Sequence, residues 1–168
     1  ARLLKENKKE LPFGLYITNS VQEEIGLRGA EMIAQTIKPN VAIVTDVTHD
    51  TTTPMIEVKK AGLLELGKGP VVAYAPAVQQ KLRDLIIETA DANNIPFQRS
   101  ALSRATGTDT DAFAYSNGGT ASALISLPIR YMHTTVEMAH KDDVENVIKM
   151  IYETLLNIKG GETFSYFE

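Results

Sequence analysis

Residues 21–26 read Val-Gln-Glu-Glu-Ile-Gly, and this short stretch places two adjacent carboxylates between an apolar segment and a glycine. The apolar segment before it predicts a strand, and the residues after Gly26 predict a helix. In open α/β sheets, ligands bind outside the carboxyl ends of the strands. Glu23 and Glu24 are therefore candidates for a site at this edge of a sheet.

Two further apolar runs lead to residues of the same chemical kind. Asp46 ends the apolar run within residues 41–48, and the run at residues 123–132 is followed directly by His133. If these runs are neighbouring strands, their ends bring two Glu, one Asp and one His to one rim. Carboxylate oxygen and imidazole nitrogen suit zinc, cobalt or manganese, and one spare carboxylate could act as general base.

Hydrophobic periodicity alternates between strand-like and helix-like segments along the chain. With 168 residues, of which 43% are hydrophobic, the chain suits a single domain that buries about 70% of its unfolded surface. The alternation predicts an α/β protein, a three-layer α/β/α sandwich with a mixed sheet. The predicted strands are residues 12–18, 41–47, 71–75, 97–102 and 122–128; the predicted helices are residues 1–10, 27–37, 77–93, a short one ending near 117, and 141–156.

Composition argues against several classes of partner. The formal net charge of −4 and the isoelectric point near 5.4 argue against nucleic acid or an anionic membrane. The sequence has no cysteine, which excludes thiolate metal sites and is compatible with a reducing cytoplasm. No apolar run approaches the roughly 18 residues of a membrane span. We therefore expect a cytoplasmic protein without nucleic-acid or membrane partners.

Each candidate residue also has a simpler structural interpretation. Adjacent Glu residues at a helix start are commonly a solvated pair favoured by the helix dipole, and an Asp after a strand is commonly a turn or N-cap residue. Asp50 competes with Asp46 as a ligand, and a lone histidine such as His133 is often structural. His140, just before the last predicted helix, is expected to be a capping or surface group. Residues 66–70, Leu-Gly-Lys-Gly-Pro, are explained by a turn and need no nucleotide.

Five segments of the chain, taken together, carry a resemblance. They are TNSVQEEIGLRGA (residues 18–30), VTDVTHDT (44–51), LGKGPV (66–71), ATGTDTDAFA (105–114) and LPIRYMHTTVEMAHKDDVENVI (127–148). In this order and at these separations they resemble the dinuclear metalloaminopeptidases of the glutamyl, deblocking and tetrahedral aminopeptidase family. The resemblance extends over nearly the whole chain.

The resemblance implies an exopeptidase that hydrolyses N-terminal peptide bonds with two divalent metal ions, zinc or cobalt. Glu23 would be the base, and the metal ligands would be Glu24, Asp46 and His133. Family members form large assemblies, so a homo-oligomer acting on peptides is expected. The residues implied beside the N-terminal residue of a bound peptide are Gly107, Thr108 and Asp109.

The chain departs from the family pattern upstream of Glu23. The family has two further ligands there, a His in a His-x-Asp motif and an Asp that bridges the metals, and neither can be placed in this sequence. The chain opens at Ala1 in a helix-like segment with no N-cap residue before it. We therefore expect residues 1–168 to be one domain, the C-terminal portion of a peptidase catalytic domain that lacks its N-terminal portion.

Two alternatives stay open. An inactive fragment or a pseudoenzyme, acting only as an oligomeric binding module, would have the same fold without a complete two-metal site. A glycosidase is a remote alternative, because such enzymes need carboxyl groups about 5–9 Å apart across a sugar ring. The adjacent Glu23 and Glu24 do not suit that arrangement.

Overall fold

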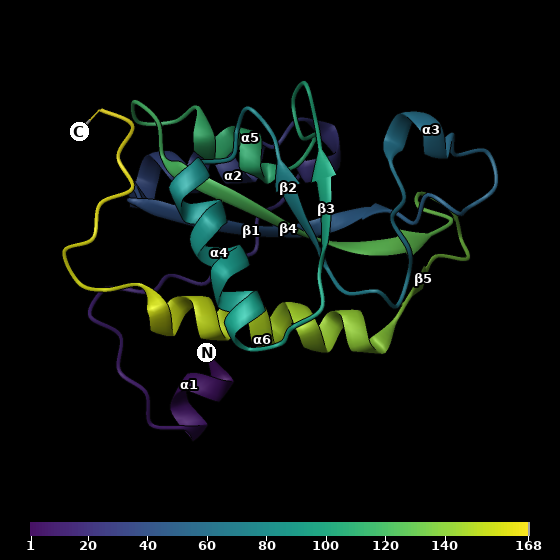
Figure 1. Cartoon of the computed structure of the whole chain (residues 1–168). Coiled ribbons are helices and arrows are strands. Elements are labelled where there is room, and N and C mark those ends of the chain that lie inside the picture. Colours follow the sequence, from purple (N-terminus) through teal and green to yellow (C-terminus); the bar gives the residue numbers. More distant parts are fainter. Residues whose placement is uncertain (168) are drawn as a thin grey trace.

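A sheet of five strands forms the centre of the computed structural model, which describes residues 1–167 (Figure 1). Four strands follow the order β1-β4-β2-β3, and β5 pairs with the end of β4. β1 is parallel to β4 and β2 is parallel to β3, whereas β2 is antiparallel to β4. The sheet is therefore mixed, as predicted. The strands are β1 Val41–His49, β2 Val71–Tyr74, β3 Gln98–Ala101, β4 Ala121–Arg130 and β5 Met138–Ala139.

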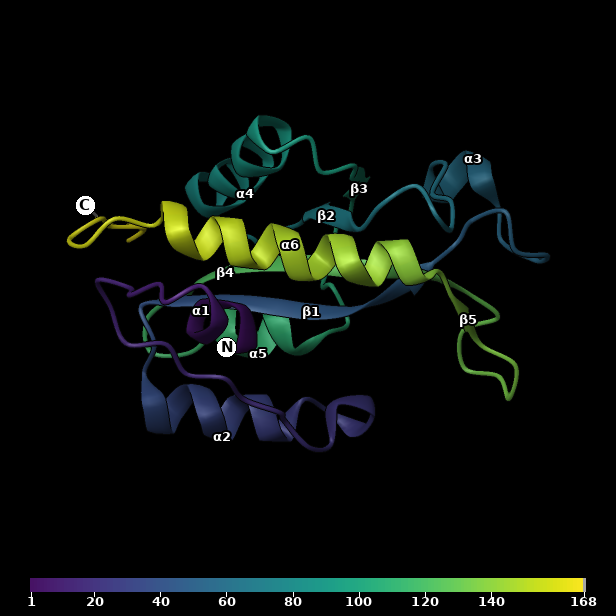
Figure 2. The ribbon, with the colours of Figure 1, turned by 90° about the horizontal axis from the view of Figure 1, so that it is seen from below.

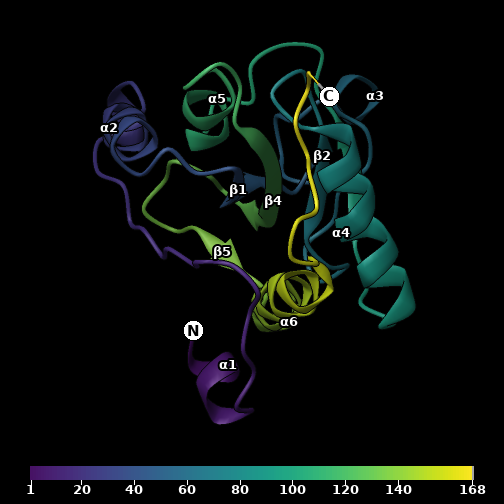
Figure 3. The same ribbon diagram turned by 90° about the vertical axis from the view of Figure 1, so that its left-hand side faces the viewer.

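Helices cover both faces of this sheet. α2 and α5 lie on one face, and α4 and α6 lie on the other (Figures 2 and 3). This arrangement confirms the three-layer α/β/α prediction. Within residues 1–167, no helix combines the length and the apolar character that crossing a membrane requires. The helices are α1 Arg2–Glu6, α2 Arg28–Ile37, α3 Val58–Ala61, α4 Gln80–Ala92, α5 Asp109–Ala114 and α6 Lys141–Asn157, with a short 3₁₀ helix, η1, at Glu23–Ile25.

Two apolar clusters hold the layers together. The cluster between the sheet and the α4–α6 pair includes Leu82, Ile125 and Met150, all fully buried. On the opposite face, Ala30 and Ala34 of α2 belong to the second cluster, which also contains residues of β1 and α5. Almost every residue of β4 is buried, which is expected for a strand covered by helices on both sides.

The predicted strand at residues 12–18 is wrong, because the structure has no strand there. Leu15, Tyr16 and Ile17 are 39%, 70% and 69% exposed. A strand needs a neighbour for its backbone hydrogen bonds, and none pairs with this segment in the described part of the chain. The predicted helix at residues 1–10 is also too long, since α1 ends at Glu6.

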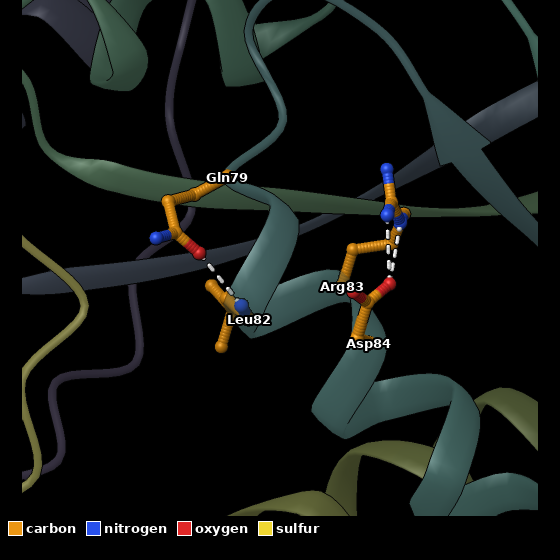
Figure 4. A network of polar contacts seen from close by, with 4 residues as sticks. All are labelled: Gln79, Leu82, Arg83 and Asp84. Carbon is orange, nitrogen blue, oxygen red and sulfur yellow. Dashed lines mark hydrogen bonds and ion pairs between the residues drawn. The ribbon is translucent and has the colours of Figure 1, made fainter. Parts of the chain in front are cut away.

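α4 begins later than predicted because Gln79 caps it. The backbone of Gln79 is extended, and its side-chain Oε1 accepts a hydrogen bond from the backbone N–H of Leu82 at 2.7 Å (Figure 4). Such a bond satisfies one of the N–H groups that a helix start leaves free. In the first turn, the Arg83 guanidinium pairs with the Asp84 carboxylate at 2.7 Å (Figure 4).

The glycine-rich segment at residues 66–70 is a turn, as predicted. The carboxylate of Asp143, fully buried at the start of α6, accepts hydrogen bonds from Gly67 N at 2.7 Å and Gly69 N at 2.8 Å. Gly69 has φ +96°, and a Cβ atom there would lie 2.2 Å from the carbonyl oxygen of Pro96. The turn therefore binds an internal carboxylate and requires glycine at residue 69.

Candidate metal and catalytic site

Glu23 and Glu24 lie in η1, a single turn between the N-terminal segment and α2. The backbone on both sides is left-handed, with φ 63° at Gln22 and φ 57° at Leu27. Residues other than glycine seldom adopt this conformation, and such residues are concentrated at functional sites. The turn leaves Glu24 exposed and Glu23 partly buried.

His133 lies in the turn that follows β4, and its side chain meets Glu24. The distance from His133 Nε2 to Glu24 Oε1 is 3.4 Å, with the two side chains 68% and 72% exposed. The backbone is left-handed at both Tyr131 (φ 60°) and His133 (φ 61°). The backbone N–H of His133 donates to Glu137 Oε1 at 2.6 Å, which fixes the turn. Two segments far apart in the sequence therefore meet at one point.

Asp46 lies on β1, opposite Ser126 of β4 in the strand register. Its Oδ1 accepts a hydrogen bond from the backbone N–H of Val47 at 2.6 Å. Burial raises the pKa of Asp46; the Val47 hydrogen bond opposes this, and the charges of Asp109 and Glu24 add to the increase. The net result is a pKa above the ordinary range, so the surroundings of Asp46 disfavour its negative charge.

Glu23 has the same kind of surroundings. Burial raises its pKa most, and the neighbouring carboxylates raise it further, whereas His133 lowers it. The neighbouring carboxylates thus disfavour the charged form of Glu23, and His133 favours it. The carboxylates that contribute, in decreasing order, are Asp46, Glu24 and Asp109.

These side chains share one region without closing a metal site by themselves. Among residues 1–167, no three His, Cys, Asp or Glu side chains are arranged so that they could hold a metal ion. The assignment of Glu24, Asp46 and His133 as ligands therefore remains a prediction. Their chemistry fits a divalent cation, because oxygen and imidazole ligands suit zinc. A cation would also offset the like charges that raise the pKa of Glu23 and Asp46.

The loop before α5 borders this region. Asp111 accepts hydrogen bonds from Thr106 N at 3.1 Å and from Gly107 N at 2.9 Å. The side chain of Thr108 caps α5 by accepting from Thr110 N at 3.2 Å. These hydrogen bonds fix the conformation of the loop, and the charge of Asp109, at the start of α5, raises the pKa of both Glu23 and Asp46.

Two residues that support the site have no assigned role in the sequence analysis. The Ser20 hydroxyl donates to Asp109 Oδ2, which ties the segment before η1 to α5. Gly29 N donates to the carbonyl oxygen of Val21 at 3.0 Å, and a Cβ atom on Gly29 would lie 2.4 Å from the Val21 backbone. The contact of Gly29 with Val21 has a signal in the sequence, because a glycine inside a helical pattern can mark a place where another backbone segment packs closely against the helix. No local signal pointed to Ser20.

Residues 1–150 match the family described as M42 glutamyl aminopeptidase. The chain belongs to this family. The match confirms the resemblance found in the sequence, and it covers every candidate residue named above. M42 peptidases depend on metal ions in general.

Several relatives of this M42 chain are longer than it is. A lysyl aminopeptidase of Pyrococcus furiosus is 42% identical over 159 residues, which are 95% of this chain and 44% of the relative. The crystal structure of a TET aminopeptidase from a marine sediment archaeon of the Thaumarchaeota is 32% identical with a TM-score of 0.83, covering 93% of this chain and 46% of that one. The TET1 peptidase of Pyrococcus horikoshii is 29% identical with a TM-score of 0.62, covering 81% and 38%. This chain spans less than half the length of each.

Asp50 and His140, also considered from the sequence, make hydrogen bonds that hold local structure in this M42 chain. Asp50 is buried, and its carboxylate accepts from Thr52 N at 2.7 Å and Leu66 N at 3.0 Å. His140 caps α6, accepting from Asp142 N at 3.2 Å through Nδ1, as predicted. Asp50 therefore holds the loop after β1 in place and shows no contact with the candidate site.

Proposed function

We propose that the protein of which these residues are part is a metal-dependent aminopeptidase that releases the N-terminal residue of peptides. The observation that carries the proposal is the 3.4 Å contact between Glu24 and His133, beside a Glu23 carboxylate whose pKa is raised by burial and by its neighbours. Family membership supplies the reaction class.

Glu23 is the general base of the proposed reaction. Its carboxylate takes a proton from the attacking water as the water oxygen bonds to the carbonyl carbon of the first peptide bond. The carbon–nitrogen bond then breaks, and Glu23 passes the proton to the leaving nitrogen. The products are a free amino acid and a peptide shortened by one residue. A raised pKa suits this role, because a group that both accepts and returns a proton works best with a pKa near the working pH.

Glu24, Asp46 and His133 are the proposed metal ligands. Divalent ions, when bound, polarise carbonyl groups and lower the pKa of water. Two ions, zinc or cobalt, need more ligands than these three side chains provide. We propose that the remaining metal ligands lie in a part of the protein that corresponds to the portion of the longer relatives outside the match.

The loop containing Gly107, Thr108 and Asp109 forms the substrate side of the proposed site. Its position beside Glu23 and Asp46 supports this assignment, because the substrate has to lie next to the base. We also propose a homo-oligomer. The TET1 peptidase of Pyrococcus horikoshii assembles into a tetrahedron or a large octahedral shell, and its structure is similar to this chain.

The test is an assay of aminoacyl p-nitroanilide hydrolysis by the natural protein, after treatment with a chelator and after addition of zinc or cobalt. The proposal expects turnover that the chelator abolishes and the added ion restores. Turnover that is insensitive to the chelator would contradict the metal assignment. Metal binding without turnover on any aminoacyl or peptide substrate would favour the alternative of an oligomeric binding module.

A further inference from the structure

The turn between α5 and β4 is built from the sequence Ser116-Asn117-Gly118-Gly119. The backbone N–H of Gly119 donates to the carbonyl oxygen of Ser116 at 2.9 Å, which closes a β-turn. Both central residues have a left-handed backbone, with φ 53° at Asn117 and φ 81° at Gly118. Two positive φ angles are typical of a type I′ turn, and Asn-Gly is the dipeptide that this turn favours. The conformation of the turn therefore explains why an asparagine stands directly before a glycine here.

The same two residues can react with each other. The backbone nitrogen of Gly118 can attack the side-chain amide carbon of Asn117 and form a new N–C bond, which closes a succinimide ring. The C–N bond of the side-chain amide breaks, and ammonia leaves with the proton that the Gly118 nitrogen has lost. Water then opens the ring at either carbonyl, which gives aspartate or isoaspartate. Glycine favours the attack because it has no side chain to obstruct it and restricts the backbone least.

The surroundings of Asn117 leave the reacting groups accessible. Asn117 and Gly118 are both exposed, and in the part of the chain that the structure describes the N–H of Gly118 donates to no acceptor. Asn94 provides a contrast, because it has the same φ of 53°. It is followed by Ile95, which is branched at Cβ and whose backbone N–H donates to the carbonyl oxygen of Ala90 at 2.9 Å. The reactive combination is therefore present at Asn117 and absent at Asn94.

We propose that Asn117 is a site of spontaneous deamidation, and that its conversion releases the turn from the end of α2. The Asn117 Nδ2 group donates to the carbonyl oxygen of Ala34, in the last turn of α2, at 2.8 Å. A carboxylate in place of the amide has no N–H to donate. Its negative charge also lies at the C-terminal end of α2, where the helix dipole is negative. Ala34 is fully buried in the apolar cluster between α2 and the sheet, so the lost contact weakens the packing of this helix.

The first experiment follows the reaction in the unchanged natural protein, incubated at mildly alkaline pH and sampled over time for tryptic peptide mapping by mass spectrometry. In the tryptic peptide of residues 105–130, Asn117 is the sole side-chain amide, so the mass gain from amide to acid is assigned without ambiguity. The peptide of residues 84–99, which contains Asn93 and Asn94, is the internal control. The mass shift should build up in peptide 105–130, as two products that separate by chromatography, while peptide 84–99 keeps its mass. An unchanged mass of peptide 105–130, or equal conversion in both peptides, would overturn the proposal.

The second experiment measures the consequence with Asn117→Asp, which reproduces one product of the reaction. The equilibrium constant for unfolding should rise about 3- to 30-fold, because a hydrogen bond is lost and a like charge is added at the end of α2. Asn40→Asp is the matched control, because Asn40 is exposed just beyond α2 and its side chain makes no hydrogen bond among the described residues. This control should change the constant by less than about threefold. Denaturant unfolding measures both variants, and unchanged stability of Asn117→Asp would overturn the proposed release of α2.

Discussion

Two groups of carboxylates in this molecule differ in what surrounds them. Asp50 and Asp143 are 3% and 0% exposed, and each accepts two backbone N–H hydrogen bonds at 3.0 Å or less. Glu23 and Asp46 lie instead beside other carboxylates, which raise their pKa in addition to the effect of burial. Within residues 1–167, Asp46 accepts one backbone N–H hydrogen bond, from Val47.

The difference separates carboxylates that hold the fold from those that are available for chemistry. A buried carboxylate that stabilises a fold has its lone pairs satisfied by the protein. Carboxylates left with free lone pairs and like-charged neighbours are typical of sites that take up a cation or a proton. Asp50 and Asp143 are carboxylates of the first kind, and Glu23 and Asp46 are carboxylates of the second kind.

The largest expected effect is on catalysis, when Glu23 or His133 of the candidate site is replaced. Glu23→Gln should lower kcat by about 10²- to 10⁴-fold, because it removes the proposed general base, while metal content stays unchanged. His133→Ala should lose metal as well as activity. Both are measured by steady-state kinetics and metal analysis, with Glu31→Gln, exposed on α2, as control. Equal metal loss in the two site variants would show that base and ligand are misassigned.

The next largest effect is on stability, when the buried carboxylate of Asp143 is removed. Asp143→Ala removes the acceptor of two N–H groups, those of Gly67 and Gly69, and each unsatisfied buried donor costs about 1–3 kcal/mol. The free energy of unfolding should therefore fall by about 2–4 kcal/mol, measured from denaturant unfolding midpoints. Glu145→Ala, exposed on the same helix, should change it by less than about 0.5 kcal/mol. A small loss for Asp143→Ala would mean that the turn rearranges to bind water.

The pH dependence of stability should have opposite signs in the two groups. Burial raises the pKa of Asp50, but hydrogen bonds from Thr52 and Leu66 and the charge of Arg130 lower it by more, so it lies below the ordinary 3.8. Ionised Asp50 therefore contributes stability that is present above pH 3.8 and lost as pH falls through the folded-state pKa. Asp46 has a raised pKa, so its ionisation reduces stability as pH rises above 3.8.

Substitution by asparagine tests these signs in metal-free protein. Asp50→Asn should be less stable than the unchanged protein at neutral pH, and Asp46→Asn should be more stable. Both differences should shrink as pH falls below the ordinary pKa of Asp, about 3.9, because the unchanged side chains then become neutral. Unfolding free energies measured between about pH 3 and pH 7 would decide the matter. Differences of the same sign would refute the division into two groups.

Local patterns were enough to predict most of the sheet and its helices. α2, β1 and α6 lie within a few residues of their predicted bounds, because their periodicity is local and their ends carry ordinary stop signals. The strand predicted at residues 12–18 failed for a physical reason: its residues favour a strand, but a strand also needs a partner. β5, with two residues, is too short for any pattern to indicate.

The candidate site could be predicted only in part. The apolar runs before Glu23 and around Asp46 singled out these residues, but their predicted place at strand ends is wrong: no strand precedes Glu23, and Asp46 lies within β1, which continues to His49. The 3.4 Å contact of Glu24 with His133 depends on the path of two distant turns. The hydrogen bond from Ser20 to Asp109 likewise joins segments 89 positions apart. No local pattern encodes either contact.

The smallest expected effect concerns α4, in the structural half of the comparison. Gln79→Ala removes the cap on Leu82 N and the hydrogen bond from Gln79 Nε2 to the carbonyl oxygen of Phe164. The loss of an N-cap costs about 1 kcal/mol, so the free energy of unfolding should fall by about 1–2 kcal/mol with kcat and KM unchanged. Gln80→Ala is the matched control, because Gln80 is exposed one residue further along the same helix. The measurement is denaturant unfolding together with the aminopeptidase assay. A change in kcat for Gln79→Ala without a change in stability would show that the α4 face affects the site, and the two regions could then not be treated as independent.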